Sequence, residues 1–161
     1  TLRAECDAVL TGGNTVRLDN PSLTIRKPDR PVSPLKEQPW RIILTHDASS
    51  IPADSICLTD EFRDRTLVVE NVFNYLELLK KLYNNKKIGT ILLEAGGCLV
   101  REFLKAGLVD EWVGFYAPII IGGGTDGVAP GPFLEHEVHL EQPVVNIFGD
   151  DVCIRGDICY R

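Results

Sequence analysis

The sequence has no excess of positive charge and no long apolar run. Its 17 lysines and arginines are outnumbered by 23 aspartates and glutamates, which gives a formal net charge of −6 with no basic cluster. This balance argues against general binding to nucleic acids or membrane surfaces, although a local basic pocket for one phosphate remains compatible with it. No segment has the length and apolarity of a membrane span or the pattern of a signal peptide.

Cysteine pairs and metal-binding motifs are also missing. The five cysteines are odd in number and form no C-x-x-C pair, which favours free thiols in a reducing cytoplasm. His136 and His139 form an H-x-x-H pair among glutamates, a pattern that fits either a metal site or a solvated acidic loop. We favour the loop and expect no metal. The H-x-E and P-C-x-x-C elements of a zinc deaminase are absent.

The sequence does contain enough apolar residues for one folded domain. Its 161 residues are 44% hydrophobic and show no internal repeat. The proline-rich segment 27–39 predicts a loop that is too short to separate two domains. Strands are predicted at 7–11, 41–45, 55–59, 66–70 and 111–121, a helix is predicted after Asn71 with apolar residues up to Tyr83, and a terminal hairpin is predicted from 138–148 and 152–160.

This alternation predicts the fold class. Strands that alternate with helices form a mostly parallel sheet with helices on both faces, and the last two strands are typical of an antiparallel hairpin. We therefore expect an α/β protein with three layers, α/β/α, and a mostly parallel sheet that ends in a C-terminal antiparallel hairpin.

The segment Ile88–Gly107 has the pattern of a nucleotide-phosphate site. Ile91–Leu93 is typical of a buried parallel strand, and Glu94 follows at its carboxyl end, where open α/β sheets bind ligands. Gly96–Gly97 leaves room for a ligand close to the backbone at the start of a helix, whose free N–H groups attract anions. Gly107 is predicted to end that helix. The pattern is neither a Walker A motif nor G-x-G-x-x-G, and a strand-to-helix turn without a ligand also explains it.

Glycine clusters follow three apolar segments, at 12–13, 96–97 and 122–124. In a parallel sheet all three would lie at the same carboxyl edge and line one cleft, although a structural turn explains any one of them. Arg26 is predicted at the mouth of this cleft. Its guanidinium group is suited to two-pronged binding of a phosphate or carboxylate.

Several of these segments, taken in order, resemble one known family. They are Leu2–Val16 (LRAECDAVLTGGNTV), Asp19–Arg26 (DNPSLTIR), Glu94–Gly97 (EAGG), Ala106–Glu111 (AGLVDE) and Ala117–Gly124 (APIIIGGG). Together they resemble the pyrimidine reductase domain of riboflavin biosynthesis, which forms the C-terminal part of a bifunctional deaminase/reductase. The resemblance covers nearly the whole chain.

The resemblance implies a dihydrofolate-reductase-like fold, a homodimer and a reaction. Members of the family use NADPH to reduce the ribosyl group of 5-amino-6-(5-phosphoribosylamino)uracil to a ribityl chain. The implied NADPH contacts are Thr15, Asp19, His46, Gly96, Gly97, Cys98, Leu99, Val100, Arg101 and Glu102, and the implied substrate contacts are Arg3, Leu23, Arg26 and Glu94. His46 departs from the pattern because a small residue is expected at this position.

Glu94 is the candidate catalytic residue. Hydride transfer to the ribose C1′ requires an opened ring, so the protein mainly positions its ligands and stabilises charge. A carboxyl group at a strand end is suited to three roles: it stabilises an iminium ion, it binds the pyrimidine or a ribose hydroxyl, or it donates a proton. We favour substrate binding over acid catalysis for Glu94.

Other interpretations remain open. The family has a strand and most of a helix before the position of Thr1, so the domain 1–161 is expected to lack them, and upstream fusion to a zinc deaminase domain is compatible with the sequence. The substrate is either the deaminated pyrimidine or its diamino precursor. Another nucleotide-dependent enzyme, such as a Rossmann-like methyltransferase, fits less well, because a proline-rich segment follows the first glycine cluster at the distance where that fingerprint normally has an acidic residue. A catalytically silent dimeric nucleotide-binding protein of the same fold is the remaining alternative.

Overall fold

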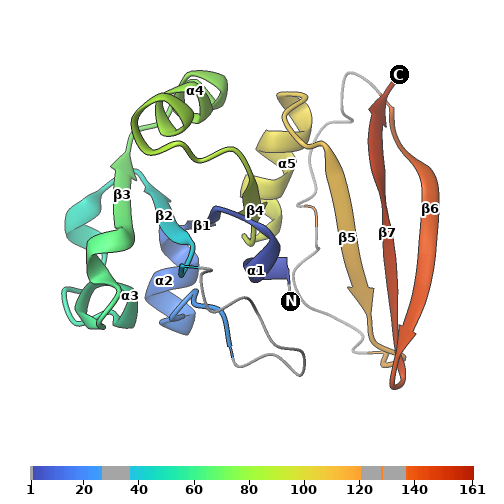
Figure 1. The fold of residues 1–161 in the computed structure, drawn as a ribbon, viewed down its shortest axis with the longest axis horizontal. Coiled ribbons are helices and arrows are strands. Elements are labelled where there is room, and N and C mark those ends of the chain that lie inside the picture. The colour runs from blue at the N-terminus through green and yellow to red at the C-terminus, as the bar shows by residue number, and fades with distance from the viewer. Residues whose placement is uncertain (1, 27–36, 121–127, 129–136) are drawn as a thin grey trace. The chain divides into compact units, whose positions relative to one another are not determined.

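The computed structural model describes residues 2–26, 37–120, 128 and 137–161. The chain forms two compact units, Thr1–Leu99 and Val100–Arg161, which are described separately (Figure 1). Within the described ranges, no helix has the length and apolarity needed to cross a lipid bilayer.

The first unit contains a four-stranded parallel sheet in the order β3-β2-β1-β4. Its strands are β1 (Ala8–Gly12), β2 (Trp40–Thr45), β3 (Thr66–Glu70) and β4 (Ile91–Leu93). The neighbouring residues Val9 and Leu10 of β1 have no exposed surface, and neither do Ile42 and Ile43 of β2. Because neighbouring strand residues point to opposite faces, both faces of the sheet centre are covered.

One short helix precedes β1, and the other helices of this unit follow its strands. The helices are α1 (Leu2–Glu5), α2 (Gly13–Asp19), α3 (Ile56–Thr59), α4 (Tyr75–Lys86) and the 3₁₀ turns η1 (Ala48–Ser50) and η2 (Arg63–Arg65). A buried cluster joins several of these elements: Val16 of α2, Ile43 of β2, Ile51 directly after η1, and Cys57 of α3. Burial raises the pKa of the Cys57 thiol.

Helix α5 (Gly97–Lys105) follows the turn after β4 and ends as predicted. Gly107 adopts φ 64°, its N–H donates to the Leu104 carbonyl, and the Leu108 N–H donates to the Phe103 carbonyl. These two bonds satisfy carbonyls at the helix end that would otherwise lack a partner.

The second unit contains an antiparallel sheet in the order β5-β7-β6. Its strands are β5 (Glu111–Tyr116), β6 (Val138–Phe148) and β7 (Asp151–Tyr160). The predicted hairpin of β6 and β7 is confirmed, with Gly149 at φ 64° in its turn. With the parallel sheet of the first unit, the hairpin confirms the predicted α/β class.

Two local predictions are wrong. In the strand predicted at 55–59, Ile56–Thr59 instead forms the helix α3, in which the Ile56 N–H donates to the Asn20 side chain and the Thr59 hydroxyl to the Ser55 carbonyl. Five residues are too few for periodicity to separate the two structures. The helix after β3 is capped by Asn74 instead of Asn71: its side chain accepts a hydrogen bond from the Glu77 N–H at 3.1 Å.

The strand predicted at 111–121 is also corrected. β5 ends at Tyr116 and pairs with β7, so it does not belong to the parallel sheet. The described strand that precedes the cluster Gly122–Gly124 thus belongs to the second sheet, and the place of this cluster at the common edge stays a prediction. Gly122–Gly124, His136 and most of the proline-rich loop lie outside the described residues.

Candidate active site

The carboxyl edge of the parallel sheet brings together segments that are distant in the sequence. Since β1 lies between β2 and β4, the residues that follow these three strands are neighbours at this edge. Thr15 lies in α2 after β1, His46 directly follows β2, and Glu94 directly follows β4. This is the edge at which parallel α/β sheets bind ligands.

Arg3 connects two of the predicted substrate segments. Its Nε and Nη2 atoms donate to the two carboxylate oxygens of Glu94 at 2.9 and 2.5 Å, and its Nη1 donates to the Thr24 carbonyl at 2.8 Å. The Glu94 side chain is 44% exposed and that of Arg3 is 15% exposed. The Glu94 N–H donates to the Leu10 carbonyl, so the main chain at Glu94 continues the pairing of β4 with β1. The carboxylate is thus fixed at the sheet edge but remains accessible.

The segment 20–26, which directly follows α2, has an unusual backbone. Asn20 has φ 43° and Leu23 has φ 54°, and Leu23 is only 1% exposed. A branched residue with positive φ costs free energy and persists only where surrounding contacts hold it. Such backbones cluster at ligand sites. Arg26, at the end of the described segment, is exposed.

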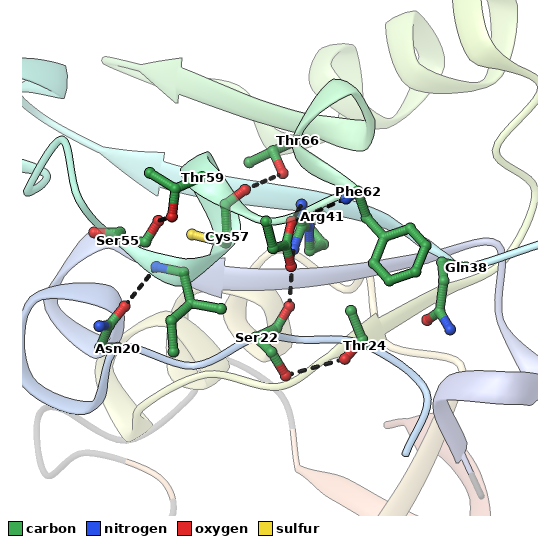
Figure 2. Close-up of polar contacts among 12 residues, drawn as sticks. Asn20, Ser22, Thr24, Gln38, Arg41, Ser55, Cys57, Thr59, Phe62 and Thr66 are labelled. Atoms are coloured by element: carbon green, nitrogen blue, oxygen red, sulfur yellow. Dashed lines mark hydrogen bonds and ion pairs between the residues drawn. The ribbon is translucent and has the colours of Figure 1, made fainter. Parts of the chain in front are cut away.

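A buried ion pair lies beside this segment, and the sequence did not predict it. Arg41 of β2 is 1% exposed and donates to the two Asp60 oxygens at 2.7 and 2.8 Å and to the Ser22 carbonyl at 3.1 Å (Figure 2). The hydrogen bonds from Arg41 lower the pKa of Asp60. An arginine inside an apolar strand next to a Pro-rich loop was the available signal, because a buried guanidinium requires a partner.

The glycines at the sheet edge differ in what surrounds them. A Cβ atom on Gly13 would lie 3.0 Å from Ile51 and Thr45 side-chain atoms, so tight packing disfavours a larger residue there. A Cβ atom on Gly96 would meet nothing within 4 Å. Packing therefore does not explain Gly96, and the space beside it can accept part of a ligand.

The remaining predicted cofactor residues lie on α2, after β2 and in α5. Thr15 and Asp19 are four residues apart in α2 and share a helix face, but Asp19 is the last residue of the helix, roughly 9 Å from its start. His46 is exposed beside Asp47, whose pKa is lowered by its hydrogen bonds to Ser49. The residues predicted in α5 occupy its first six positions: Gly97, Cys98, Leu99, Val100, Arg101 and Glu102.

The histidine and acidic residues do not gather into a metal site in the part of the chain that the structure describes. No group of three potential ligands lies together among those residues. His139 contacts Glu137, with 2.9 Å between Nε2 and a carboxylate oxygen. Among the described residues, the sheet edge instead carries the guanidinium group of Arg3, the carboxylate of Glu94 and the open turn at Gly96.

Comparison with known proteins matches residues 1–154 to the family model of the RibD C-terminal domain. The chain is 34% identical over 126 residues to the riboflavin biosynthesis protein RibD of Mycobacterium tuberculosis, which covers 78% of this chain and 34% of that protein. It is 32% identical over 141 residues to the 2,5-diamino-6-ribosylamino-4(3H)-pyrimidinone 5′-phosphate reductase of Aquifex aeolicus. This match covers 76% of this chain and 61% of that protein.

A solved structure gives the same result. Acinetobacter baumannii RibD superposes with a TM-score of 0.82 and 25% identity, over 98% of this chain and 48% of that one. The chain thus spans a third to a half of the RibD proteins it matches. The architecture is the dihydrofolate-reductase-like fold of the RibD reductase domains, and the chain belongs to the family of the RibD C-terminal domain.

Proposed function

We propose that the chain is a reductase domain of riboflavin biosynthesis that uses NADPH to convert the ribosyl group of 5-amino-6-(5-phosphoribosylamino)uracil to a ribityl chain. The observation that carries the proposal is the contact of Arg3 with both Glu94 and the Thr24 carbonyl. It joins the strand end after β4 to the segment that contains Leu23 and Arg26, next to the open turn at Gly96. Family membership supports the same assignment.

The turn at Gly96 fits a dinucleotide phosphate. Because a Cβ atom at Gly96 would meet no other atom within 4 Å, the turn leaves space for the ligand. The first N–H groups of α5 supply hydrogen-bond donors and a positive dipole end. In this proposal Thr15, Asp19 and the start of α5 hold the cofactor, and His46 lies at its margin. When bound, NADPH supplies a hydride for the reduction.

The substrate residues bind and orient the phosphoribosylamino group. Arg26 is an exposed cation suited to the phosphate, and Leu23 supplies a buried, rigid backbone position. Arg3 fixes the Glu94 carboxylate, which then holds the pyrimidine or the open-chain sugar while C1′ accepts the hydride. Both Glu94 oxygens accept hydrogen bonds from Arg3. We therefore propose that Glu94 holds the substrate and do not propose it as the proton donor.

Two pyrimidines are candidate substrates. Several RibD proteins match the chain, which favours the deaminated uracil. Other relatives are named as reductases of the 2,5-diamino-pyrimidinone, which favours the diamino precursor as the second candidate. The two compounds differ at one position of the pyrimidine ring, an amino group in place of a carbonyl oxygen.

The second unit supports a homodimer. The pairing register places Tyr116, Val145, Ile147 and Ile154 on one face of its sheet, and the first three are more than half exposed. An apolar face of this kind is typical of a protein interface. We propose that two copies of the chain associate through it. Cys57, Cys98, Cys153 and Cys159 form no disulfide, which supports a reducing compartment such as the cytoplasm.

A coupled assay tests the reductase function directly. Oxidation of NADPH is followed by absorbance with each pyrimidine, in the full-length protein that contains this domain. We expect turnover with the uracil compound, with slower or no turnover of the diamino compound. Binding of NADPH without turnover of either compound would instead favour a catalytically silent nucleotide-binding protein.

A further inference from the structure

Arg41 is a buried charge that none of the proposed ligand contacts uses. It lies on the central strand β2 with 1% of its surface exposed, and its two Nη atoms contact the two Asp60 oxygens. A charged residue is seldom buried this deeply without a fixed set of partners. Asp60 is itself held at the end of α3, where its N–H donates to the Ile56 carbonyl and its Oδ1 accepts from the Phe62 N–H.

The guanidinium of Arg41 has a third contact, with the proposed substrate segment. Nη1, which already donates to Asp60, also donates to the Ser22 carbonyl at 3.1 Å (Figure 2). Ser22 directly precedes Leu23, the buried residue with φ 54°. The contact therefore ties the rigid sheet to the point at which the segment adopts its unfavourable backbone conformation.

Two arginines hold the carbonyl groups on either side of Leu23. Arg3 donates to the Thr24 carbonyl and Arg41 donates to the Ser22 carbonyl. The Ile25 N–H donates to the Gln38 side chain at 2.7 Å, which adds a third side-chain contact to this short stretch. Three side chains, one from α1 and two from the segment 38–41 at the start of β2, thus impose the conformation that presents Leu23 and Arg26.

We propose that Arg41, oriented by Asp60, is a positioning residue that fixes the segment Ser22–Arg26 for binding of the phosphoribosylaminopyrimidine. The inference rests on the proposed function. Arg41 does not contact the substrate: it acts through the Ser22 carbonyl. Asp60 keeps the planar guanidinium in the one orientation from which Nη1 reaches both acceptors.

Lysine cannot replace this arrangement. Its ammonium group keeps the charge opposite Asp60 but has no planar fork, so it cannot hold two carboxylate oxygens and a carbonyl at fixed positions. Arg41→Lys is therefore the informative substitution, since it preserves charge balance and removes the orientation. Arg155→Lys is the matched control, because Arg155 also donates two hydrogen bonds to one carboxylate, that of Glu111, on the other unit.

The experiment compares these variants in the full-length protein by substrate-dependent NADPH oxidation and by NADPH titration. We expect Arg41→Lys to raise KM for the pyrimidine by about tenfold, the effect of one lost charge-assisted hydrogen bond, with kcat and NADPH affinity changed by less than about twofold. Arg155→Lys should change none of the three. Equal losses of pyrimidine and NADPH binding, or an unchanged KM, would overturn the proposal.

Hydrogen exchange provides a readout that needs no substrate. In Arg41→Lys the Ile25 amide should exchange faster, while the amides of β1 keep their protection. Unchanged exchange at Ile25 would contradict the proposal. If Arg41→Lys does not fold, Asp60→Asn is assayed in the same way, and an unchanged KM in that variant also overturns it. If the unsubstituted protein reduces neither pyrimidine, the proposed function is wrong. The hydrogen exchange of the Ile25 amide then tests the positioning role of Arg41 by itself.

Discussion

Arg3 and Glu94, which are 91 positions apart in the sequence, form a two-pronged ion pair at the carboxyl end of β4. The third nitrogen of the same guanidinium binds the Thr24 carbonyl. One side chain therefore sets both the position of the candidate catalytic carboxylate and the path of the segment beside it. Loss of either partner is expected to affect the substrate more than the cofactor.

The substitution Glu94→Gln tests whether Glu94 holds the substrate or donates a proton. The amide keeps the size of the side chain but removes its charge, so the ion pair with Arg3 is lost. We expect KM for the pyrimidine to rise by roughly tenfold to a hundredfold, in line with about 1.5–3 kcal/mol for a hydrogen bond to a charged group, with a smaller change in kcat. Steady-state kinetics measure both values.

The matched control is Glu77→Gln, an exposed glutamate in α4 that pairs with Lys80. It should leave both constants unchanged, because exposed pairs of this kind contribute little. A large fall in kcat for Glu94→Gln with an unchanged KM would instead assign acid catalysis to Glu94.

The sequence predicted the strands of the first unit well because each is short, apolar and followed by a polar or glycine-containing segment. β3 begins and ends where the pattern predicted, β2 begins one residue earlier than predicted, and β1 is shifted by one residue at both ends. The sheet in which β5 pairs could not be predicted in this way. Periodicity along one strand indicates which residues alternate, but it carries no information about the partner strand.

The site could be predicted only in part, for a related reason. Local pattern was enough to predict that Glu94 and the turn at Gly96 lie at the carboxyl end of one strand, because both follow β4 directly. The role of Arg41 depends on a contact with Ser22 and Asp60, each 19 positions away. Likewise, the positive φ of Leu23 follows from contacts with the surrounding chain, since leucine itself does not favour it.

Substitution of the glycines at the two ends of α5 separates ligand binding from folding. Gly96→Ala adds a methyl group into space that no other atom of the protein occupies, so we expect unchanged thermal stability but weaker NADPH binding if the phosphates approach this turn. Gly107→Ala should do the opposite: at φ 64° it costs about 1 kcal/mol of stability, and NADPH affinity should stay constant.

Thermal unfolding and fluorescence titration of NADPH measure the two effects for each variant. Unchanged NADPH affinity in a folded Gly96→Ala protein would remove the turn from the cofactor site. A loss of affinity in Gly107→Ala that matches the loss in Gly96→Ala would show that the helix as a whole, and not the space at Gly96, determines binding.

The face of the second sheet that carries Tyr116, Val145 and Ile147 predicts a dimer that one charge can disrupt. Ile147 is 74% exposed and shares this face with Val145, while Asn146 between them points to the opposite face. We expect Ile147→Lys to shift the protein towards a monomer and Asn146→Lys to leave its mass unchanged. Light scattering after size-exclusion chromatography gives the mass, and a monomeric unsubstituted protein would contradict the proposed interface.

The ion pair of Asp60 with Arg41 makes a part of the stability depend on pH. Hydrogen bonds from Arg41 lower the pKa of Asp60 below 3.8 in the folded protein, so the folded state binds this proton less readily than the unfolded state does. The stabilisation is therefore fully present above pH 3.8 and is lost as the pH falls through the lowered folded-state value. Asp60→Asn removes this contribution at every pH.

The free energy of unfolding, from urea titrations followed by circular dichroism, should thus differ most between the unsubstituted protein and Asp60→Asn near neutral pH. The difference should shrink as the pH falls below 3.8. Asp47, whose pKa is also lowered by its hydrogen bonds to Ser49, is present in both proteins, so its own loss of stabilisation cancels in the comparison. A difference that stays constant from neutral to acid pH would mean that Asp60 binds its proton equally in both states, and that the contact with Arg41 does not stabilise the carboxylate.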